Sequence, residues 1–78
     1  MRKKVQQVVV SFETTTQAMA FELMAKEFNI KGRLIPVPRD ITAGCGLAWR
    51  SDPDTKSEIE ELIKQKSLII DCIYELII

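Results

Sequence analysis

The chain has 78 residues, which is enough for one domain and leaves few residues to form a deep substrate cavity. Its 11 lysine and arginine residues balance 11 aspartate and glutamate residues, so the formal net charge is zero. This balance argues against a nucleic-acid partner bound through bulk positive charge. Because no apolar run approaches the ~20 residues of a membrane-spanning helix, we expect no membrane insertion. Length and charge together favour a carrier, a binding module or a subunit over a stand-alone enzyme.

The inventory of reactive side chains is short. The chain contains two cysteines, Cys45 and Cys72, and no histidine. Without histidine, neither Ser-His-Asp nor Cys-His catalysis has a base within this chain. Two cysteines alone also argue against a protein-only zinc site, so we expect neither a metal nor a cofactor. Since the cysteines form no CxxC pair or disulfide framework, we expect a cytoplasmic protein.

The first half of the chain predicts a strand, a helix and a second strand. β-branched residues predict a central strand over residues 5–12, and the threonines at 14–16 supply helix N-cap candidates. Residues 17–28 follow with helical spacing of apolar side chains. The predicted buried face of this helix consists of Phe21, Met24, Ala25 and Phe28. Residues 33–37 predict the second strand, which should lie at a sheet edge because Pro36 cannot donate to a ladder.

The second half predicts a strand, a helix and a closing strand. After a loop over residues 39–44, residues 46–50 predict a short strand. Asp52 and Pro53 open a helix as N-cap and first helical residue, and residues 68–78 predict an apolar last strand. The order β-α-β-β-α-β predicts a single α+β domain over residues 1–78, a ferredoxin-like sandwich with a four-stranded antiparallel sheet backed by two helices. In that fold the first and third strands lie in the middle of the sheet.

The least generic segment is the loop PVPRDITAGCG, which contains Cys45. Gly44 and Gly46 flank the cysteine and permit positive φ and a close approach of another molecule. Successive amides in such a loop can form an anion-binding concavity. Arg39 and Arg50 stand on either side in sequence, and a hairpin would bring their backbones close. Cations and amides favour the thiolate, which could accept a sulfur or selenium atom or attack a disulfide.

The alternative is that Cys45 is a small hairpin residue and that the glycines serve only the turn. Cys72 lies in an alternating strand, which predicts a buried structural thiol. Its other interpretation is a resolving partner for Cys45. The usual strand order argues against an intramolecular disulfide, because it separates the second and fourth strands. Trp49, the single tryptophan, is predicted to be half-buried packing, with an interface anchor as the alternative.

The run from Arg33 to Ala48, RLIPVPRDITAGCGLA, resembles the hallmark of a family of short, mostly bacterial proteins described as selenium/sulfur carrier-like. The resemblance also covers the opening strand and helix and the closing residues 73–75. It implies that Cys45 carries the chalcogen and that sulfur or selenium donor and acceptor proteins are the partners. It further implies that Arg39, Asp40, Gly44 and Gly46 form the setting of the thiol. Ala43-Gly44 stands where serines are frequent in the family, so any help from those hydroxyls is lost here.

Two further expectations complete the sequence-based account. The apolar closing strand is predicted to favour a homodimer or larger assembly, because a bare apolar edge pairs with another chain. The competing function is a non-catalytic regulatory or dimerisation module that binds a small anion or a protein partner. The fold cannot decide between this module and a carrier, because one fold hosts many functions.

Overall fold

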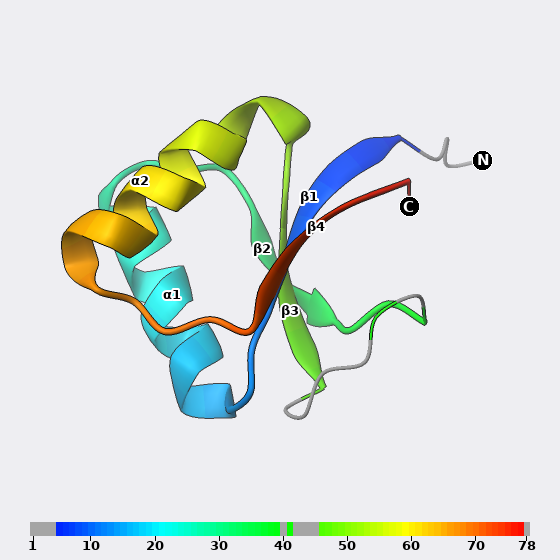
Figure 1. Cartoon of the computed structure of the whole chain (residues 1–78), viewed down its shortest axis with the longest axis horizontal. Helices are drawn as coiled ribbons and strands as arrows, with labels where there is room; N and C mark the ends of the chain where they lie inside the picture. The colour runs from blue at the N-terminus through cyan, green and yellow to red at the C-terminus, as the bar shows by residue number, and fades with distance from the viewer. Residues whose placement is uncertain (1–4, 40, 42–45, 78) are drawn as a thin grey trace.

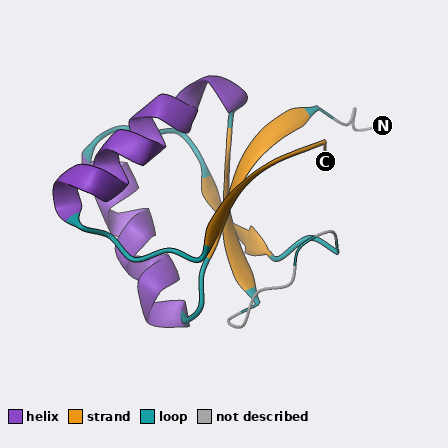
Figure 2. Cartoon of the chain, in the orientation of Figure 1, coloured by secondary structure: helices purple, strands orange, loops and turns teal. Residues whose placement is uncertain are grey.

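The computed structural model describes residues 5–39, 41 and 46–77, which form one antiparallel sheet with two α-helices on one of its faces (Figure 1, Figure 2). The elements follow the predicted order. Their bounds are β1 Gln6–Ser11, α1 Thr15–Glu27, β2 Arg33–Pro36, β3 Leu47–Ser51, the 3₁₀ turn η1 Pro53–Thr55, α2 Lys56–Lys66 and β4 Cys72–Ile77. The strand order β2-β3-β1-β4 places the first and third strands in the middle, as predicted. Each of the three strand pairings is antiparallel.

The main core lies between the sheet and the helices. Alternation along β1 directs Val8 and Val10 toward the helices and Val9 toward the opposite face. Trp49 pairs with Val10 in the ladder and is 1% exposed, so the prediction of a half-buried tryptophan is wrong. Its burial follows from the central position of β3, whose helix-facing side chains are covered. The indole packs edge-on against Phe21 of α1, with ring centroids 5.5 Å apart.

Helix α1 begins at a predicted cap and ends earlier than predicted. The Thr14 side chain accepts a hydrogen bond of 3.2 Å from the backbone N–H of Gln17, so one of the three candidate threonines caps the helix. Phe21 and Ala25 are fully buried, as expected. Phe28 was expected on the same face and is 45% exposed. It is the C-cap residue, so it leaves the helical spacing, and the Lys66 ammonium lies 5.2 Å from its ring centroid.

The last strand is shorter than the predicted range 68–78, because β4 begins at Cys72. Helix α2 ends at Lys66, and its C-cap residue Ser67 adopts the left-handed conformation with φ 51°. The following segment crosses from the helix layer to the sheet, and its Leu68 and Ile70 side chains pack against the main core. The apolar residues of this segment therefore pack against the core and do not pair in the sheet. Neither helix within the described ranges has the length and apolar character needed to cross a membrane.

Candidate functional site

The face of the sheet opposite the helices carries a second apolar cluster, which lies beneath the β2–β3 loop. Val9 and Ala48 are fully buried there although no helix covers this face. Ile41, a residue of the loop, is 5% exposed and packs with both. Partly buried side chains surround these three, namely Ile35, Val37, Tyr74 and Leu76. The loop is therefore held on the sheet by burial of its own isoleucine.

Backbone hydrogen bonds hold the two ends of the same loop. The ladder between β2 and β3 ends at the pair Pro36 and Leu47. Beyond it, the Val37 N–H donates to the Gly46 carbonyl at 2.9 Å, and the Ile41 N–H donates to the Pro38 carbonyl at 3.0 Å. Gly46 has φ 75°, so the positive φ expected beside the cysteine is observed. The segment that contains Cys45 therefore leaves and re-enters the sheet at fixed positions.

The structure places some of the predicted site residues and leaves others outside its described part. Asp40, Gly44 and Cys45 lie outside the described residues, as does residue 43. Arg39 is exposed and lies in the described start of the loop. Gly46 directly precedes β3. The roles assigned to these residues stay predictions.

Arg39 and Arg50 are not cross-strand partners in the hairpin. Arg50 pairs with Arg33, whereas the loop opens at the other end of the hairpin, after Pro36 and before Leu47. Arg50 lies three positions along β3 from Leu47, which corresponds to a distance of about 10 Å. The sequence did not fix where the hairpin ladder ends.

Cys72 is exposed, so its predicted burial is wrong. Alternation does place it on the same sheet face as Tyr74, but β4 is an edge strand and Cys72 is its first residue. The ladder aligns Ala48, Ser11 and Cys72 in one row across the sheet. Two strand spacings, about 10 Å, therefore separate Ala48 from Cys72. The second thiol lies at the end of the sheet where the β2–β3 loop enters β3.

Polar groups surround this second thiol. The buried Ser11 hydroxyl accepts a hydrogen bond of 3.2 Å from the Cys72 N–H and donates one of 3.1 Å to the Asp71 carboxylate. Interaction with the Cys72 thiol is the main cause that raises the pKa of Tyr74 above its usual 10.0, and burial raises it further. The Ser11 hydroxyl acts in the opposite direction. No group of three or more potential metal-ligating side chains occurs in the described part of the chain.

Two functional features were missed from the sequence. Ile41 is the large apolar residue of an otherwise polar loop, and that contrast could have indicated an anchor. The pairing of Arg33 with Arg50 follows from the hairpin register, which the sequence did not fix.

These features define a small α+β domain whose β2–β3 loop, with a cysteine in its sequence, is anchored on the face opposite the helices. The chain belongs to a protein family, because residues 7–75 match the family model described as "Putative Se/S carrier protein-like". This finding confirms the resemblance seen in the sequence. The comparison with curated proteins finds no match, and neither does the comparison with solved structures.

Proposed function

We propose that this protein carries sulfur or selenium on Cys45 and delivers it to a partner enzyme. The family match over residues 7–75, a range that includes this cysteine, is the observation that carries the proposal. The anchored loop supports it, because Ile41 and the Val37–Gly46 hydrogen bond hold the chain on both sides of the cysteine. A transferable atom must be presented to two partners in turn, and a loop of fixed ends suits that task.

The loading step requires a thiolate and a donor of sulfane sulfur or its selenium counterpart. The Cys45 thiolate attacks the terminal sulfur of a polysulfide, a new S–S bond forms, and the shortened polysulfide leaves with the electron pair of the broken bond. The cysteine then bears a persulfide. Arg39 and the amides beside Gly44 and Gly46 would stabilise the anion, and Asp40 would orient the arginine. Arg50, which pairs with Arg33 in the ladder, would add positive charge to the same hairpin.

The same proposal includes three finer assignments. The strand order β2-β3-β1-β4 supports the ferredoxin-like class for this α+β sandwich. A reducing cytoplasm would keep both cysteines available as thiols. The donor and acceptor would be sulfur- or selenium-handling proteins.

Intact mass spectrometry tests the loading step. The reduced protein is incubated with inorganic polysulfide, and we expect the wild type to gain the mass of one sulfur atom. Cys45→Ser should lose this adduct, whereas Cys72→Ser, the matched control at the exposed second thiol, should retain it. Equal loading of the two variants would contradict the assignment to Cys45. Loading of neither the wild type nor Cys72→Ser would favour the non-covalent binding module.

A further inference from the structure

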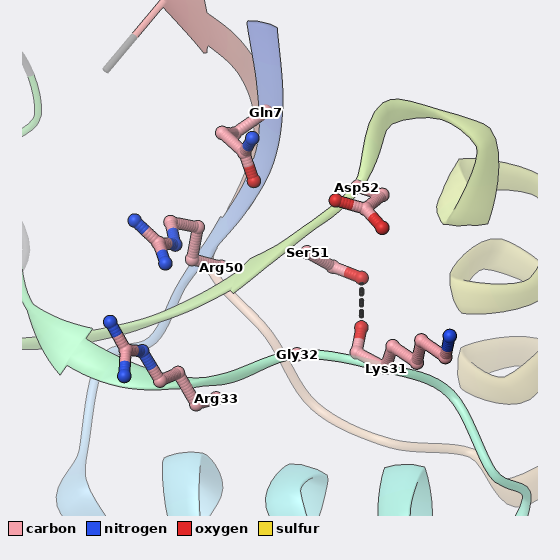
Figure 3. Close-up of a pocket in the computed structure, with 7 residues that line it drawn as sticks. All are labelled: Gln7, Lys31, Gly32, Arg33, Arg50, Ser51 and Asp52. Carbon is pink, nitrogen blue, oxygen red and sulfur yellow. Dashed lines mark hydrogen bonds between the residues drawn. The ribbon is translucent and has the colours of Figure 1, made fainter. Parts of the chain in front are cut away.

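A cavity of about 240 Å³ lies at the end of the β2–β3 hairpin that is remote from the cysteine loop (Figure 3). We call it the Arg33–Arg50 pocket. Its lining residues are Gln7, Lys31, Gly32, Arg33, Arg50, Ser51 and Asp52. The volume is below the ~300–1,000 Å³ of sites for drug-sized ligands, so the pocket suits a small ion or one terminal group of a larger molecule.

Two arginines of this pocket make no ion pair with another described residue. Arg33 and Arg50 are direct cross-strand partners, and their guanidinium groups extend to the same side of the strands (Figure 3). Like charges directly opposite each other destabilise a sheet. Among the described residues, neither arginine forms an ion pair, since the one salt bridge found there joins Lys56 and Glu75. An anion bound between the guanidinium groups would remove this repulsion.

The other charged side chains of the pocket leave it positive. Lys31 adds a third cation to the lining, although its ammonium points away from the two guanidinium groups in Figure 3. Asp52 supplies the single carboxylate among the seven lining residues. Three cations against one carboxylate give the pocket an excess positive charge in a protein whose total charge is zero. The positive charge is thus concentrated locally and is not a property of the whole surface.

An amide side chain in the lining of the same pocket makes no hydrogen bond within the described part of the chain. Gln7 is only 9% exposed, and its side chain forms no hydrogen bond to another described residue. The amide lies beside Arg50, on the side of the strands that faces the pocket (Figure 3). Ser51, by contrast, is already used, since its hydroxyl donates to the Lys31 carbonyl and contacts the Thr55 hydroxyl at 2.7 Å. The Gln7 amide is therefore free to donate to an oxygen atom of a ligand bound in the pocket.

We propose that the Arg33–Arg50 pocket binds a phosphate group. Guanidinium groups donate pairs of parallel hydrogen bonds, and a phosphate offers enough oxygens to engage two guanidinium groups and an amide at once. A carboxylate has two oxygens, so a bidentate pair with one arginine leaves no further oxygen for the second arginine and the amide. The pocket lies about 10 Å along the strands of the hairpin from the start of the cysteine loop. Phosphate binding here is therefore a function beyond the proposed sulfur or selenium transfer. Inorganic phosphate and phosphate monoesters share the required chemistry.

Calorimetric titration of the full chain at constant ionic strength tests this site. The probes are inorganic phosphate, phenyl phosphate and acetate. We expect binding of at least one of the two phosphates and none of acetate. Each of Arg33→Ala and Arg50→Ala should weaken phosphate binding about tenfold or more, as expected for loss of a charge-assisted hydrogen bond. Lys64→Ala, which removes a positive charge from the exposed surface of α2, should leave it unchanged.

Thermal unfolding gives a second readout that is independent of titration heats. Phosphate should raise the melting temperature of the wild type but not that of Arg33→Ala, because only a ligand bound to the folded state stabilises it. If the phosphates and acetate have equal effects, binding is not selective and the proposal is wrong. The proposal is also wrong if neither phosphate binds, or if both arginine variants retain the wild-type affinity.

Discussion

Truncation of Ile41 tests whether the cysteine loop is anchored on the sheet. This side chain is 5% exposed and packs against Val9 and Ala48, both fully buried. Ile41→Ala removes three carbon atoms from this cluster. At about 0.8 kcal/mol per buried methyl or methylene group, the lost burial alone corresponds to about 2.4 kcal/mol of unfolding free energy. A cavity term would add to this value, whereas relaxation of the loop would reduce it. We therefore expect a loss of about 2 kcal/mol.

Such a loss is easily measured in a domain of this size. For 60–100 residues, 1 kcal/mol corresponds to about 4–8 °C in melting temperature, so Ile41→Ala should unfold about 8–16 °C below the wild type. Trp49 is the single tryptophan and is 1% exposed, so its fluorescence reports unfolding directly.

Ile69→Ala is the matched control, because it makes the same chemical change at a side chain that is 65% exposed. It should change stability by less than about 0.5 kcal/mol. If the two variants have the same stability, Ile41 does not anchor the loop.

Three further predictions concern other parts of the molecule. Tyr74, the single tyrosine, should titrate above pH 10.0 by ultraviolet difference absorbance, and Cys72→Ser should lower its pKa toward that value. Because folding raises the pKa of Tyr74, this residue adds stability to the folded state below pH 10, and that stability is lost as the pH rises through the folded-state pKa. An unchanged Tyr74 pKa in Cys72→Ser would exclude the thiol as the cause. Gly32→Ala should cost more than about 3 kcal/mol in chemical denaturation, because the new Cβ would lie 2.5 Å from the Arg50 carbonyl and 2.6 Å from the Trp49 ring. Gly46→Ala is the control, because a Cβ added there would have no atom within 4 Å, and it should cost only the ~1–2 kcal/mol of its positive φ. An equal loss of stability for the two variants would argue against the packing around Gly32. Finally, we expect self-association through the exposed edge strand β4, where Ile77 is 67% exposed. Sedimentation should show that Ile77→Lys weakens it, and a wild type that stays monomeric at concentrations on the order of tens of micromolar would contradict it.

The sequence predicted the architecture well because the relevant signals are local. The β-branched run of β1, the cap at Thr14 and the Asp52-Pro53 start, which opens the 3₁₀ turn η1 directly before α2, each reflect backbone preferences that tertiary contacts did not override. Pro36, the last residue of β2, and Pro38 just beyond it indicated an edge strand, and β2 does lie at an edge. The order of elements then left few topologies for a small antiparallel sheet.

The site was harder to predict because it depends on register and coverage. Alternation assigned Cys72 to a face but could not show that the start of β4 stays uncovered. The length of the β2–β3 ladder decided that Arg50 meets Arg33 instead of Arg39. Likewise, burial of Ile41 depends on contacts with the sheet face that carries no helix, which no local signal in the sequence indicated. Long-range packing, and not local preference, decided each of these cases.

Release of sulfane sulfur to cyanide tests the carrier function most directly. The wild type is loaded with polysulfide, freed of excess donor and treated with cyanide, which removes the outer persulfide sulfur as thiocyanate and restores the thiolate. We predict about one thiocyanate per chain for the wild type and for Cys72→Ser, and none for Cys45→Ser. Thiocyanate released by Cys45→Ser at the wild-type level, or by no form of the protein, would contradict the assignment of the carried atom to Cys45.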